Sequence, residues 1–221
     1  MSLLGFDTST SASSACVLRA DGDAYEVLPP PERLGDPPAH ASELMPAVAE
    51  VMDASGLSWG DLRAIAVGVG PGAFTGLRIG VATARALAAA NGLPLRPVSS
   101  LAALAAGIDD ELRLAVIDAK RGEVFAALYG PDGALLAPSA LPAEALAKQV
   151  RAGGFDPLAA GDGSVRFRGA LESAGIRVAP DDAGANVVRG LHVCRLAQGV
   201  GDEPPEAVLP DYLRAPDAKP Q

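Results

Sequence analysis

The sequence predicts an α/β protein built from two halves of similar layout. Hydrophobic residues make up 49% of the 221 residues but aromatic residues only 4%, so small aliphatic side chains must fill the core. This composition favours helices packed tightly on a sheet. The charged fraction of 20% is too low for a disordered chain. A repeated pattern of strand, aspartate, polar turn, strand and Asp-Gly turn indicates the two halves.

The repeat has a fixed offset of 111 positions. Asp-Gly turns are common, so coincidence is the alternative explanation. Agreement of the strand end, the hairpin and the register favours duplication. The matching pairs are Leu3 with Leu114, Asp7 with Asp118, Ala15 with Ala126, Asp21 with Asp132, and Gly22 with Gly133.

Hydrophobic periodicity places the elements of each half. In the first half we expect strands over 3–7, 14–18, 25–28, 64–69 and 94–98, and helices over 40–55, 75–90 and 99–106. In the second half we expect strands over 112–118, 123–129 and 157–160, helices over 141–151, 164–174 and 185–198, and a late strand or hook over 207–214. The predicted subdomains are 1–107 and 108–221. This layout resembles the duplicated actin/Hsp70-like (ASKHA, RNase H-like) fold.

Charge and composition exclude several functions. The net charge is −9, the pI is about 4.7, and no basic cluster is longer than Lys120-Arg121. Because phosphate contacts require lysine and arginine, we expect no autonomous tRNA or DNA binding. Cys16 and Cys194 lie in apolar contexts and are interpreted as buried thiols. Neither a signal peptide nor a membrane-spanning run is recognisable, which predicts a reduced, cytoplasmic compartment.

The first repeat carries a group of polar residues, Asp7-Thr8-Ser9-Thr10. A carboxylate beside small hydroxyls suits a nucleotide's phosphates and hydrated Mg²⁺, so these residues could form a vestigial phosphate site. An Asx or Ser/Thr turn that caps a strand explains them equally well. The residues alone leave both interpretations open.

The glycine-rich run 70–80 does not match a phosphate loop, since it has neither the Lys-Ser/Thr of a Walker A motif nor G-x-G-x-x-G. In the helix expected over 75–90, which overlaps the end of this run, Gly76, Gly80, Ala84 and Ala88 form a stripe of small residues. Glycine inside a helix costs about 1 kcal/mol relative to alanine, so close contact with another element must offset it. Packing on the chain's own sheet is one explanation. We predict instead that the stripe faces a partner helix.

No catalytic or metal site can be assembled from the motifs. His40 and His192 are the only histidines, and Leu44 stands where His-x-x-x-His would need a second one. No G-x-S-x-G elbow frames a serine nucleophile. The expectation is therefore no catalytic residue, no metal and no cofactor. An ATP-dependent kinase or ATPase of the same fold remains an alternative, with 159–164 as a weak adenosine site.

Five stretches resemble the TsaB (YeaZ-like) family, and the run 70–82 is the most specific of them. The others are 5–10, 40–46, 117–125 and 210–214. The resemblance implies a non-catalytic scaffold that binds TsaD, together with the ATPase TsaE, and supports threonylcarbamoyl transfer to adenosine 37 of ANN-decoding tRNAs. It implies a second half that is reduced relative to the catalytic paralogue TsaD, and contact with tRNA only through the complex. A homodimer and a peptidase acting on the partner are further alternatives within this family.

Two helices are predicted to form the partner surface, those that start at His40 and at Thr75. A single strand joins them, so a right-handed crossover brings them side by side on one sheet face. The predicted partner-binding residues are His40, Glu43, Met45, Ala49, Met52, Gly76, Ile79, Gly80, Thr83 and Ala84.

Overall fold

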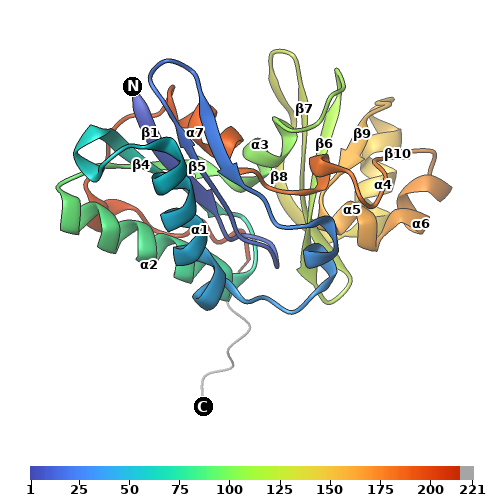
Figure 1. Ribbon diagram of the computed structural model, residues 1–221. Helices are drawn as coiled ribbons and strands as arrows, with labels where there is room; N and C mark the ends of the chain where they lie inside the picture. Colours follow the sequence, from blue (N-terminus) through green and yellow to red (C-terminus); the bar gives the residue numbers. More distant parts are fainter. Residues whose placement is uncertain (215–221) are drawn as a thin grey trace.

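The computed structural model describes residues 1–214 and contains two five-stranded sheets (Figure 1). The first sheet has the order β3-β2-β1-β4-β5. β1 pairs antiparallel with β2 and parallel with β4, which in turn runs parallel to β5. Its strands are β1 Ser2–Asp7, β2 Ser14–Leu18, β3 Ala24–Val27, β4 Leu62–Gly70 and β5 Leu95–Ser99.

The second sheet repeats this arrangement with the order β10-β9-β6-β7-β8. β6 again pairs antiparallel with the strand that follows it and parallel with the fourth strand of its half. Its strands are β6 Arg113–Lys120, β7 Glu123–Gly130, β8 Gly133–Pro142, β9 Leu158–Ala160 and β10 Arg177–Val178. Since order and direction agree strand for strand, the predicted duplicated actin/Hsp70-like fold is confirmed.

Seven α-helices lie within residues 1–214, and layers of helices cover the outer face of each sheet and fill the space between the sheets (Figure 1). α1 and α2 cover the outer face of the first sheet, and α4 and α6 cover that of the second. α3 and α7 lie between the sheets. None of these helices is long and apolar enough to cross a membrane. The helices are α1 His40–Ser55, α2 Phe74–Asn91, α3 Ser100–Ala105, α4 Ala143–Ala152, α5 Asp162–Arg166, α6 Arg168–Ser173 and α7 Gly190–Ala197.

The two halves share one core, because the last helix of the second half packs on the first sheet. α7 contacts β1 and β2, and α3 contacts β6 and β7. Cys16 and Cys194 meet in this layer as free, fully buried thiols, as predicted. A Cβ atom on Gly5 would lie 2.5 Å from the Cys194 sulfur, so this glycine lets α7 approach the sheet closely.

Several predicted elements differ from the structure. The helix expected over 164–174 is divided into α5 and α6, because Phe167 leaves the helical conformation. The helix expected over 185–198 begins only at Gly190. Buried Asn186 holds the preceding segment through its bonds to Pro180 and Gly161. Two strands were not predicted, β8 and the two-residue β10, and β8 delays the start of the helix expected over 141–151 to Ala143. Residues 207–214 form a hook without a strand. The last seven residues of the predicted second subdomain, 215–221, lie outside the described residues.

Candidate functional site

The turn after β1 is closed around Asp7. The Ser9 N–H and hydroxyl donate to Asp7 Oδ1 at 2.7 and 2.5 Å, and the Ser100 hydroxyl donates to Oδ2 at 2.6 Å. Burial raises the pKa of Asp7, although the bonds from Ser100 and Ser9 oppose this shift. The hydrogen bond from the Ser9 N–H to the Asp7 side chain forms an Asx turn. Of the two interpretations of this segment, the turn that caps a strand therefore describes the observed geometry.

The four residues proposed as a vestigial phosphate site lie inside the molecule. Thr8 and Ser9 have no exposed surface, and Asp7 and Thr10 are 1% and 3% exposed. Helix α2 covers the turn, and the Thr8 hydroxyl donates to the Gly76 carbonyl at 2.8 Å. In this arrangement a phosphate cannot reach the turn unless α2 moves away.

The small-residue stripe of α2 faces the β1–β2 turn, not a partner. A Cβ atom on Gly76 would lie 2.1 Å from the Thr8 carbonyl oxygen, and one on Gly80 would lie 2.3 Å from Thr8 Oγ1. Ala84 and Ala88 are fully buried. The prediction that this stripe faces a partner is therefore wrong. The close approach of the turn explains why glycine is needed here.

His40 and Met52 of the predicted partner surface are buried as well, with exposures of 2% and 7%. His40 Nδ1 lies 2.8 Å from the Ser13 hydroxyl, while its Nε2 has no hydrogen-bond partner and faces the first turn of α2 at Gly76. Burial lowers the pKa of His40 and also that of His192, whose Nε2 is likewise unpaired. Both rings are therefore harder to protonate than an exposed histidine.

Acidification is expected to remove the contribution of His40 to stability. Unfolded histidine has a pKa of about 6.5, and the folded pKa is lower, so the unfolded chain takes up protons first. The contribution is complete above pH about 6.5 and is lost as the pH falls toward the folded pKa. We expect the unfolding free energy of the wild type, relative to His40→Gln, to fall measurably between pH 7 and pH 5 in urea denaturation.

The comparison with His40→Gln isolates this histidine, since His192 and the carboxylates titrate in both chains. Asp162, with a pKa of about 6, acts in the opposite direction, because a raised carboxylate pKa favours the folded state as the pH falls. A difference between wild type and His40→Gln that stays constant from pH 7 to pH 5 would contradict the assignment.

The remaining predicted partner residues lie on the outer side of α1 and α2. These two helices contact each other on one face of the first sheet, as the crossover argument predicted (Figure 1). Met45 is 44% exposed, Ala49 is exposed, and Ile79 and Thr83 are half-buried. Glu43 is also half-buried and forms an ion pair with Arg33 at 2.6 Å. We call these five residues, with exposed Ala82 and Ala86, the α1–α2 outer face.

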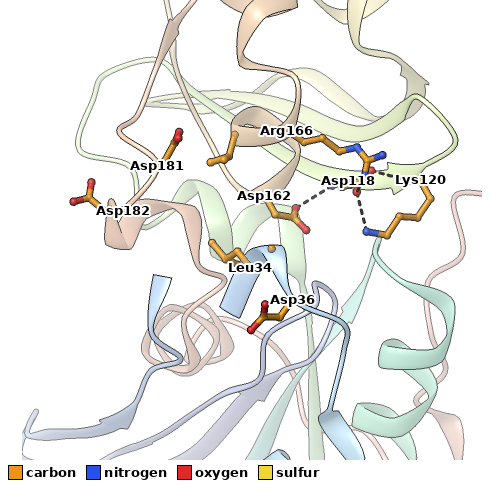
Figure 2. A pocket seen from close by; sticks show the side chains of 10 residues that line it. Leu34, Asp36, Asp118, Lys120, Asp162, Arg166, Asp181 and Asp182 are labelled. Carbon is orange, nitrogen blue, oxygen red and sulfur yellow. Dashed lines mark hydrogen bonds and ion pairs between the residues drawn. The ribbon is translucent and has the colours of Figure 1, made fainter. Parts of the chain in front are cut away.

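A cleft between the halves holds a second group of polar residues, of which the sequence reasoning selected only the weak adenosine candidate 159–164 as a site. Figure 2 shows Asp118, near the end of the first strand of the second half, between Lys120 and Arg166. Its Oδ2 lies 2.8 Å from Lys120 Nζ and 3.0 Å from Arg166 Nη1. These residues line a cavity of about 450 Å³, together with Asp36 from the first half. The offset of 111 positions from Asp7 is the signal that could have identified Asp118.

Asp162 is the other buried carboxylate of the cleft, and it belongs to the weak adenosine candidate 159–164. Its Oδ1 accepts a hydrogen bond from the Asp118 N–H at 2.9 Å. Burial raises its pKa to about 6; the Asp118 N–H opposes the shift and the Asp118 carboxylate adds to it. Gly161 and Gly163 of the same segment pack on the backbone of β6. The wall of the cleft is therefore acidic. Its buried carboxylate Asp118 already has two cationic partners, Lys120 and Arg166.

The chain is similar to proteins involved in threonylcarbamoyladenosine biosynthesis in tRNA. A family model described as TsaD, tRNA N6-adenosine threonylcarbamoyltransferase, matches residues 37–157. The tRNA threonylcarbamoyladenosine biosynthesis protein TsaB of Escherichia coli K12 is 39% identical over 138 residues, which are 60% of this chain and 56% of that protein. The chain thus spans little more than half the length of this curated relative.

Two further relatives match over almost the whole chain. An uncharacterized protein of Mycobacterium tuberculosis is 34% identical, over 99% of this chain and 94% of its own length. The solved structure of YeaZ from Pseudomonas aeruginosa superposes with a TM-score of 0.77 at 31% identity. That match covers 96% of this chain and 99% of the other.

Proposed function

Since this chain belongs to the TsaB/YeaZ family, we propose that it is a non-catalytic subunit of the machinery that makes threonylcarbamoyladenosine in tRNA. In this role it binds TsaD, works with TsaE, and supports threonylcarbamoyl transfer to adenosine 37 of ANN-decoding tRNAs. The complex, not the lone chain, contacts the tRNA. The proposed role places the protein in the cytoplasm, where tRNA is modified.

The observation that carries the proposal is the α1–α2 outer face. It presents an exposed methionine and exposed alanines on two adjacent helices, a surface that another helix pair can approach closely. By contrast, the polar turn at Asp7 is filled by the chain's own side chains. A scaffold needs an exposed surface such as the α1–α2 outer face, and it does not need an open site at the Asp7 turn.

We expect the lone chain to bind tRNA weakly and to transfer no threonylcarbamoyl group. A net charge of −9 opposes phosphate contact, and the basic residues are scattered. Gel-shift assays at physiological salt should show no submicromolar binding unless TsaD is present. Reconstituted modification should require TsaD, TsaE and this chain together.

Nucleotide titration of the lone chain separates this proposal from the kinase or ATPase alternative. The scaffold role predicts neither saturable ATP binding nor hydrolysis by the chain alone. ATP turnover without TsaE or TsaD, or modification at full rate when this chain is omitted, would overturn the proposed function.

A further inference from the structure

The chain after α7 is firmly seated on the first half of the molecule. The Glu203 backbone exchanges two hydrogen bonds with Leu95 of β5, and the Asp202 carboxylate pairs with Arg96 at 2.7 Å. Val208 is 1% exposed within the core of that half, and the Asp211 N–H donates to the Val69 carbonyl of β4 at 2.7 Å. The segment thus reaches the mouth of the cleft in a fixed position.

Three side-chain contacts then hold residues 211–214 at the cleft. The Tyr212 ring lies against Phe74 of α2, with ring centroids 4.9 Å apart. The Arg78 guanidinium lies 3.8 Å from the centre of the Phe74 ring and donates to the Tyr212 hydroxyl at 3.0 Å. One residue pair crosses to the other half: Arg214 Nη1 lies 2.7 Å from Glu123 Oε2 of β7.

We infer that residues 211–214 form a clasp that closes one side of the cleft, in addition to the shared core that already joins the two halves. The clasp is anchored on β4 and α2 of the first half and on β7 of the second. It also forms a wall of a cavity of about 440 Å³ that is lined by the first turn of α2 and by Asp118 and Lys120. Release of the clasp opens this side of the cleft. The inference does not depend on the proposed function.

Two measurements on the full chain test the clasp. Amide hydrogen exchange by NMR reports release of the segment at the Asp211 N–H. Spin labels at Thr75→Cys and Asp182→Cys, two exposed positions on opposite sides of the cleft, report the separation of the halves. Because Cys16 and Cys194 are fully buried, they do not compete for the label.

Tyr212→Ala and Arg214→Glu should both speed exchange at Asp211, by about tenfold for Tyr212→Ala, and add a longer component to the label distances. Adding Glu123→Arg to Arg214→Glu restores opposite charges and should return both readouts toward wild type. Leu209→Ala, an exposed position just before the clasp, is the matched control and should change neither.

Two results would overturn the inference. If exchange quickens while the label distances stay as in the wild type, the segment is a tail that binds one half only. If neither readout changes in Tyr212→Ala and Arg214→Glu, the contacts do not hold the segment in place.

Discussion

Replacing Gly80 with leucine should unfold the protein or lower its free energy of unfolding by about 3 kcal/mol or more. Even the first side-chain atom would lie 2.3 Å from Thr8 Oγ1, and the rest of the leucine would extend into the turn that α2 covers. The turn cannot yield easily. Thr8 is bonded to Gly76, and the neighbouring Asp7 is fixed by Ser9 and Ser100.

Urea denaturation followed by circular dichroism measures this effect, and Ala86→Leu is the matched control. Ala86 lies on the exposed side of the same helix, so the same side chain there should change the free energy of unfolding by no more than about 0.5 kcal/mol. A Gly80→Leu chain as stable as Ala86→Leu would contradict the packing of the turn beneath α2.

Much of the fold follows from local patterns in the sequence. The apolar period of Leu44, Val48 and Val51 predicts the buried side of α1, and these residues are 1% exposed. Gly56 adopts the left-handed conformation that ends the helix, as its position predicts. The fixed offset between Asp7 and Asp118 predicts two sheets of equal layout, because a duplicated sequence keeps its strand order.

The direction in which the small-residue stripe of α2 faces could not be predicted from such local patterns. Leu77 and Val81 already supply an apolar face for the sheet, so Gly76 and Gly80 looked available to a partner. The structure shows that the buried side of α2 is wide enough to include both sets, because the β1–β2 turn rises against the helix. That contact joins residues 68 positions apart and leaves no periodic signal.

The cleft illustrates a second limit of sequence reasoning. Asp7 and Asp118 occupy equivalent positions, yet their partners differ: two serines surround the first, and Lys120 and Arg166 neutralise the second. The longer polar turn of the first half is replaced by a tight turn at Arg121 and Gly122, both with positive φ. The repeat predicts the backbone position of Asp118. It does not predict that Arg166 of α5 contacts the Asp118 carboxylate.

A charge on the α1–α2 outer face should strongly weaken the proposed association with TsaD while leaving the fold intact. Met45 is 44% exposed, so Met45→Glu keeps the side chain in water in the free chain. In a helix–helix interface the same carboxylate would lose its water without gaining a partner. We expect the dissociation constant to rise by about 100-fold or more, which corresponds to about 3 kcal/mol.

Leu135→Glu is the matched control for this variant. Leu135 is 47% exposed, like Met45, but lies on β8 in the second half of the molecule. It therefore introduces the same charge at a similarly exposed apolar position outside the α1–α2 outer face. Both variants should match the wild type in circular dichroism and in urea denaturation.

Titration calorimetry of TsaD with the wild type, Met45→Glu and Leu135→Glu tests most directly whether the chain acts through this face. The wild type and Leu135→Glu should bind alike and support modification of tRNA in the reconstituted system, while Met45→Glu should fail in both assays. Wild-type affinity of a folded Met45→Glu chain, or an equal loss in Leu135→Glu, would contradict this account.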